Sequence, residues 1–171
     1  MKVYTLGSSN VDAPALYEAI LPYSTQCVQY PLLLSGLIMK PNQVKSIPLD
    51  TDSIILRSEI SPTIKELDWG KYEKLVRIRI CLKAMSRTNR FLVHDLPQLS
   101  SVIVERGAFA TSNEVDKECR IYECPKLTTL SFQRGSFKLF SLLELRNLPL
   151  LTSFELVSSF TKGKTLHLQG K

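Results

Sequence analysis

The side chains of this sequence with the most obvious chemical potential are its cysteines. Cys27, Cys81, Cys119 and Cys124 include no C-x-x-C pair of the kind that holds structural zinc. Cys119 and Cys124 stand at positions where other copies of the repeat described below carry leucine. They are therefore interpreted as buried thiols, and no metal ligand is predicted.

The histidines and acidic residues also form no recognisable catalytic group. His94 and His167 lie in different repeats, and no serine or cysteine occupies a nucleophile elbow. A polysaccharide-cleaving β-helix would need acidic groups clustered on one sheet, whereas Asp68, Asp95 and Glu123 fall near predicted corners. The sequence also lacks a glycine-rich phosphate loop. We expect no catalytic residue and no cofactor, and the chain is predicted not to be an enzyme.

Basic residues are concentrated in one short segment, residues 71–90. Seven of them, against one acidic residue, give this segment a net charge of +6, which equals the net charge of the whole chain. They are Lys71, Lys74, Arg77, Arg79, Lys83, Arg87 and Arg90. Such a segment can attract nucleic acid, an acidic protein or an anionic membrane. Tyr72 is the one aromatic residue in this segment and no nucleic-acid-binding motif appears, so an acidic protein is the favoured functional interpretation, beside a merely solvated strand edge.

The element that positions all these groups is an internal repeat. FLVHDLPQLSSVIVERGAF, CRIYECPKLTTLSFQRGSF and LLELRNLPLLTSFELVSSF place their apolar residues in matching columns. An earlier copy begins at Leu67, and the copies then begin at residues 91, 119, 143 and 166. A period of twenty-odd residues is typical of a solenoid, in which each unit buries its apolar face against its neighbours.

Each repeat is predicted to contribute two short parallel strands, because it contains two stretches in which apolar and polar residues alternate. Pro97, Pro125 and Pro149 stand between the two strands, where a bend needs no N–H group. Gly107 and Gly135 mark a second corner, where a positive φ is easiest for glycine. The predicted fold class is therefore mainly β, a solenoid with two short parallel strands per repeat, with a parallel β-helix as the nearest alternative.

The ends of the chain depart from the repeat. Residues 1–42 are predicted to form an N-terminal cap with a short helix that begins near Asp12, and they include a possible degenerate repeat. Residues 43–171 are predicted to form the solenoid, whose last repeat is incomplete. An incomplete last coil leaves backbone N–H and C=O groups of its strands without hydrogen-bond partners, so self-association through the C-terminal end is one expectation. No signal peptide or membrane span is evident, and a cytoplasmic location is the default expectation.

The segments LPQLSSVIVERGAF, CPKLTTLSFQRGSF and LPLLTSFELVSSF resemble leucine-rich repeats, and the small residue before each phenylalanine is similar to the irregular, BspA-like variety. Arg106, Arg134 and Ser158 depart from the usual asparagine, and no stretch suits a helical return, which favours a solenoid of two sheets. The resemblance implies a concave sheet that binds proteins. The side chains predicted to face outward from it are Arg77, Arg79, Ser101, Ile103, Glu105, Thr129, Ser131, Gln133, Ser153 and Glu155.

The sequence thus favours a non-enzymatic protein-interaction module. Two alternatives remain open at this level: a basic module that binds nucleic acid through residues 71–90, and a structural segment of a larger solenoid.

Overall fold

The computed structural model describes residues 37–38, 47–56, 64–110, 117–160 and 165–169, and these residues contain eleven β-strands and no helix. The strands are β1 (Leu37–Ile38), β2 (Ser53–Leu56), β3 (Glu66–Asp68), β4 (Arg77–Ile80), β5 (Arg90–His94), β6 (Ser101–Val104), β7 (Glu118–Tyr122), β8 (Thr129–Phe132), β9 (Leu142–Arg146), β10 (Ser153–Leu156) and β11 (Thr165–Gln169). The predicted N-terminal helix lies outside the described residues.

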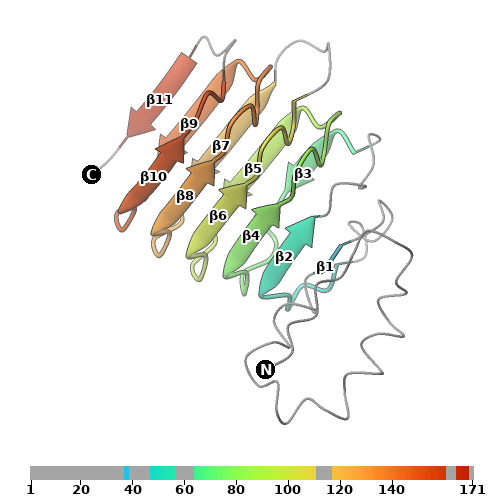
Figure 1. Ribbon diagram of the computed structural model, residues 1–171. Helices are drawn as coiled ribbons and strands as arrows, with labels where there is room; N and C mark the ends of the chain where they lie inside the picture. The colour runs from blue at the N-terminus through green and yellow to red at the C-terminus, as the bar shows by residue number, and fades with distance from the viewer. Residues whose placement is uncertain (1–36, 39–46, 57–63, 111–116, 161–164, 170–171) are drawn as a thin grey trace, which may run out of the picture.

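The strands form two parallel sheets that advance coil by coil along the molecule (Figure 1). Sheet A has the order β1-β2-β4-β6-β8-β10, and sheet B has the order β11-β9-β7-β5-β3. From β2 onward, successive strands of the chain alternate between the two sheets, so each of these coils contributes one strand to each sheet. The prediction of a mainly β solenoid with two parallel strands per repeat is confirmed.

The register of the strands aligns the predicted apolar columns. In sheet A, Ile54, Ile78, Val102, Leu130 and Phe154 are successive partners. The inward side chains of the repeats between residues 67 and 137 are buried and form one core between the sheets. Each Å² of apolar area that these columns remove from water contributes about 25 cal/mol to the free energy of folding.

The corner between the two strands of a repeat is a tight turn with proline in its second position. The amide of Leu99 donates to the carbonyl of Leu96 at 3.3 Å, and Leu127 donates to Cys124 at 3.1 Å. Pro97 and Pro125 follow the first residue of these turns, where their fixed φ suits the bend. Proline therefore lies at the bend between the two strands of these repeats, as predicted.

The second corner contains two left-handed positions in each repeat. Gly107 and Gly135 have φ of 69° and 74°, as the sequence predicted. Two residues later, Phe109 and Phe137 also have positive φ, of 58° and 50°. In the next coil Ser158 and Phe160 take these two positions, with φ of 46° and 53°. Phenylalanine disfavours this conformation, and its recurrence shows that packing of the ring into the core outweighs the local preference.

The last described coil is less covered than those before it. Phe154 and Leu156 occupy inward columns of β10 but are 42% and 40% exposed. Their neighbours in the preceding coil, Leu130 and Phe132, are fully buried. β10 and β11 lie at the ends of their sheets in the described part of the chain, so no described strand covers these side chains.

Strand β1 lies within the range predicted to be a cap, residues 1–42, and already pairs in parallel with β2. In the described residues there is no helix that is long and apolar enough to span a membrane.

Candidate functional site

The ten side chains predicted to bind a partner come together along the outward face of sheet A. One row crosses β4, β6, β8 and β10 through Arg77, Ser101, Thr129 and Ser153. The second row contains Arg79, Ile103, Ser131 and Glu155. Glu105 and Gln133 directly follow β6 and β8. We call these ten residues the sheet A face.

Arg79 and Glu105 form an ion pair at the basic end of the sheet A face. An Arg79 guanidinium nitrogen lies 2.6 Å from Glu105 Oε1, and the Leu82 amide donates to Glu105 Oε2 at 2.9 Å. These contacts fix the carboxylate of Glu105 and direct the Arg79 side chain along the sheet. Arg77 is exposed on the same strand.

The other end of the face is acidic and contains hydroxyl groups. Ser131 donates a hydrogen bond to Glu155 Oε2 at 2.5 Å across neighbouring strands. Ser131 is buried, while Ser101, Ile103 and Thr129 are half-buried, so the middle of the face is low in relief. The face therefore combines a flat centre with opposite charges at its two ends.

The outward side of sheet B carries a network of ion pairs. Arg90 bridges Glu66 and Glu118, at 2.7 and 2.6 Å, and Arg120 bridges Glu118 and Glu144, at 2.8 and 3.0 Å. The Arg120–Glu144 pair is the one the sequence predicted from neighbouring repeats. Glu118 and Arg120 share β7, and the register of β3, β5, β7 and β9 places their other partners on adjacent strands, so the network fastens coil to coil.

The network changes the acidity of its central carboxylate. Burial raises the pKa of Glu118, but hydrogen bonds from Arg90 and Arg120 outweigh that effect, and the pKa of Glu118 is lowered overall. The hydrogen bond to Glu118 is also the largest cause that raises the pKa of Arg90. Both shifts favour the charged pair, as expected for an interaction that stabilises the folded chain.

A second cluster on sheet B surrounds His94. Its ring nitrogens lie 3.0 Å from Asp68 Oδ1 and 2.8 Å from Asp95 Oδ2. The ring stacks on Tyr122 with 5.1 Å between centroids, and the Arg146 guanidinium lies 5.0 Å from the Tyr122 centroid on the next strand. Burial raises the pKa of Tyr122, and the carboxylates of Asp95 and Asp68 add to the shift.

Gly70 makes this stack possible, because a Cβ atom at this position would lie 2.2 Å from Cε1 of His94. The absence of a side chain at position 70 therefore allows the imidazole to lie flat against the neighbouring coil.

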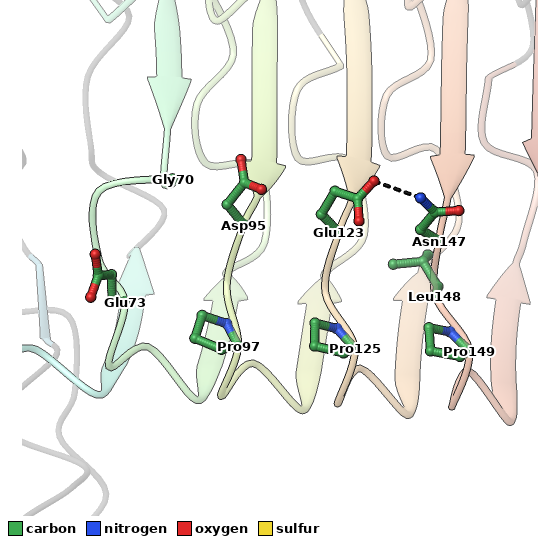
Figure 2. A pocket seen from close by; sticks show the side chains of 9 residues that line it. All are labelled: Gly70, Glu73, Asp95, Pro97, Glu123, Pro125, Asn147, Leu148 and Pro149. Atoms are coloured by element: carbon green, nitrogen blue, oxygen red, sulfur yellow. Dashed lines mark hydrogen bonds between the residues drawn. The ribbon is translucent and has the colours of Figure 1, made fainter.

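A groove of about 580 Å³ runs across the proline corners (Figure 2). Asp95, Glu123 and Asn147 occupy the same place in successive coils along it, and each has a positive φ, of 54°, 53° and 51°. The Asn147 side-chain amide donates to Glu123 Oε1 at 2.6 Å. The remaining lining residues are Gly70, Glu73, Pro97, Pro125, Leu148 and Pro149. The groove thus offers a row of hydrogen-bond acceptors beside apolar prolines.

Sequence reasoning placed Asp95 and Glu123 near corners but missed that Asn147 extends the same row. The signal was available, because each of the three residues stands two positions before the proline of its repeat. Asp and Asn are also among the residues that best tolerate a left-handed backbone.

The seven basic residues of the 71–90 segment do not share one face. Arg77 and Arg79 lie on β4 of sheet A, whereas Arg90 begins β5 of sheet B. Lys71 lies 5.1 Å above the ring of Tyr72, at the corner before β4. The segment is about one coil long, so its charges are distributed around the solenoid. Two of the basic residues are already paired: Arg79 with Glu105, and Arg90 with Glu66 and Glu118.

Cys119 and Cys124 are buried, as predicted. Burial raises the pKa of Cys119 well above its ordinary value. Burial also raises the pKa of Cys124, to about 11, and its Sγ donates to the Tyr122 carbonyl at 3.3 Å. Both thiols are therefore protonated at neutral pH and are poor nucleophiles. Cys27 lies outside the described residues.

Within the described ranges, no three histidine, cysteine or acidic side chains come together as a group that could hold a metal ion. In comparisons with known proteins, the chain matches no protein-family model, no curated protein and no solved structure at a significant level.

Proposed function

We propose that this chain is a non-enzymatic protein-interaction module of the leucine-rich repeat type, which binds a protein partner through the sheet A face. The observation that carries the proposal is the strand register, which aligns eight of the ten predicted contact residues in two rows across four neighbouring strands. A repeat structure of this kind turns separate short segments into one continuous surface.

The chemistry of the face suits a protein better than a small ligand. Ile103 is an apolar contact near the centre, and serine and threonine hydroxyls surround it. Arg77 and Arg79 stand at one end, and Glu155 stands at the other. Complementary charges on a partner would set its orientation and steer its approach, while the low centre would admit a flat surface.

The distribution of basic residues gives less support to a nucleic-acid interface. Affinity for a phosphate backbone requires several cations on one side of a protein. Here the basic residues of the 71–90 segment are divided between β4, β5, the corner before β4 and the corner between β4 and β5. The proposed partner surface therefore uses only Arg77 and Arg79 of that segment.

The experiment compares two variants that change charge equally in the same coil. Arg77→Glu with Arg79→Glu reverses the basic end of the sheet A face, and Lys71→Glu with Lys74→Glu reverses the exposed corner before β4. Proteins captured from a lysate by the native chain would be identified, purified and titrated against all three chains. Circular dichroism would establish that each variant is folded.

We expect the arginine variant to weaken binding at least about tenfold, which corresponds to about 1.4 kcal/mol, and the lysine variant to bind as the native chain does. Equal losses in the two variants would indicate attraction by overall charge. Unchanged binding in both variants would overturn the sheet A face as the contact surface.

A further inference from the structure

Charged residues are distributed unevenly among the sides of the solenoid. Between residues 53 and 169, the strands of the two sheets contain five basic and five acidic residues. The corners between the two strands of a repeat contain three of each, within residues 69–76, 95–100, 123–128 and 147–152. The connections from sheet A to the next strand of sheet B contain ten basic and four acidic residues, within residues 57–65, 81–89, 105–117, 133–141 and 157–164. These connections therefore carry the whole net charge of residues 53–169, which is +6.

The described parts of these connections lie side by side along one edge of the solenoid. The strands of sheet A are parallel, so the residues that follow them leave the sheet at the same end (Figure 1). The amide of Lys83 donates to the carbonyl of Arg106 at 3.1 Å, and the amide of Gly107 donates to the carbonyl of Arg134 at 3.2 Å. Neighbouring coils of a parallel sheet are about 4.8 Å apart. We call this surface the second-corner edge.

The second-corner edge exposes basic side chains that have few counterions. In the described residues that follow β4, β6 and β8, the exposed basic side chains are Lys83, Arg87, Arg106, Arg134 and Lys138. All of these except Lys138 have no carboxylate partner among the described residues. Glu105, the one acidic residue in the described part of this edge, is already paired with Arg79. Neighbouring cations without counterions repel one another, so this edge favours an anionic partner.

The apolar residues of the second-corner edge do not suit a protein partner. A protein interface has apolar or aromatic anchors near its centre. Here Phe109 and Phe137 are fully buried in the core. The large apolar side chains exposed in the described part of the edge are Leu82 and Val157, at 45% and 40%, and they lie three coils apart. No apolar centre therefore forms between them.

The shape of the charged surface distinguishes a linear polyanion from a membrane. An anionic membrane is a plane, and a protein that binds it by charge benefits from basic residues over a broad face. In this solenoid the strands on both sides of the edge have no net charge. The excess cations instead follow one line from coil to coil, which matches a charged chain lying along the edge.

We propose that the second-corner edge binds the phosphate backbone of double-stranded nucleic acid without sequence preference. Successive phosphates of one DNA strand are about 3.4 Å apart along the helix axis, and long basic side chains from coils about 4.8 Å apart can reach them. Arg106 and Arg134 can each hold a phosphate through two N–H groups. No aromatic side chain is exposed in the described part of this edge, so base stacking contributes nothing and the more highly charged duplex is favoured. This surface is separate from the sheet A face.

Fluorescence anisotropy of labelled DNA duplexes of about 20 base pairs tests the proposal between about 50 and 200 mM salt. Five phosphate contacts predict that log K falls with log salt concentration with a slope of about −4 to −5. Two duplexes of unrelated sequence should bind equally. An absence of binding at the lowest salt concentration would overturn the proposal, as would a strong preference for one sequence. Tighter binding to phosphatidylserine vesicles or to polyglutamate than to DNA would assign the edge to a membrane or to an acidic protein instead.

Two variants that remove equal charge locate the binding surface. Arg106→Gln with Arg134→Gln changes the second-corner edge, and Lys71→Gln with Lys74→Gln changes the exposed corner before β4. We expect the arginine variant to bind DNA at least about tenfold more weakly and to reduce the salt slope by about 2, whereas the lysine variant should keep both. Equal losses in the two variants would show attraction by net charge and would overturn the assignment to this edge.

The arginine variant is expected to fold, because neither side chain has a partner among the described residues. Circular dichroism and the urea midpoint would confirm this. The salt slope of the native chain needs no substitution, so it tests the number of phosphate contacts even if a variant does not fold. A native slope shallower than about −2 would contradict a row of cations on the phosphate backbone.

Discussion

The rings of Phe109 and Phe137 stack face to face inside the solenoid, with 4.5 Å between centroids and 8° between planes. Phe160 continues the stack on Phe137 at 5.2 Å and 16°. All three residues have a left-handed backbone, so the same local conformation recurs in each coil and delivers the ring to the same place. The stack therefore links the second corner of each repeat to the next.

Phe137→Ala should strongly destabilise the chain, because Phe137 is fully buried and touches rings on both neighbouring coils. Loss of a buried phenylalanine costs about 3–5 kcal/mol in unfolding free energy. Urea denaturation followed by circular dichroism measures this value. Phe160→Ala is the control, and its smaller loss should follow from the half-buried position of Phe160. Equal losses at both sites would contradict the difference in burial.

Gly70→Ala should destabilise the chain by about 1–3 kcal/mol, the usual range for overpacking, because the added Cβ would collide with the His94 ring. The same substitution in a His94→Ala background should cost much less, since the colliding atoms are then absent. A double-mutant cycle by urea denaturation measures the coupling between the two positions. Additive effects would show that the collision is relieved in another way.

Gly135→Ala tests the cost of backbone conformation separately from packing. Gly135 has a φ of +74°, and a Cβ there would meet no atom within 4 Å. The expected loss of unfolding free energy is therefore about 1–2 kcal/mol, from the left-handed conformation alone. Thermal unfolding of the variant gives this value. Gly135→Asn is the matched control and should lose less, because asparagine tolerates this conformation better than alanine does.

Glu118→Gln should reduce the acid sensitivity of the fold. The pKa of Glu118 is lowered in the folded chain by Arg90 and Arg120 acting against burial. Its contribution is thus fully present above the unfolded pKa, about 4.3, and is lost as pH falls through the lower folded pKa. Urea midpoints measured at neutral and acidic pH should differ less in Glu118→Gln than in the native chain. Glu73→Gln, at the exposed corner, should keep the native difference.

The sequence alone was sufficient to predict the fold class, because burial between stacked coils demands the same type of residue at the same place in every coil. Leu99 and Leu127 recur after Pro97 and Pro125 for this reason, and all four lie where the repeat predicts. The alternation of Arg77, Ile78, Arg79 and Ile80 likewise predicted which side chains face outward, and their burial pattern agrees.

The conformational preference of each residue type predicted only some of the positive φ angles. It predicted a positive φ at Gly107 and Gly135, but it did not predict one at Phe109 or Phe137. At those positions the stacked rings supply packing energy from neighbouring coils, which a residue's own propensity does not contain.

Only the tertiary structure decided which residues meet across coils and which are left uncovered. His94 contacts Asp68 from 26 positions away, and the register of β3 and β5 brings them together. Phe154 has the same apolar character as Leu130, yet it is exposed because β10 lies at the edge of sheet A in the described chain. A repeated sequence determines what each coil can bury, whereas the presence of a neighbouring coil decides whether that surface is buried at all.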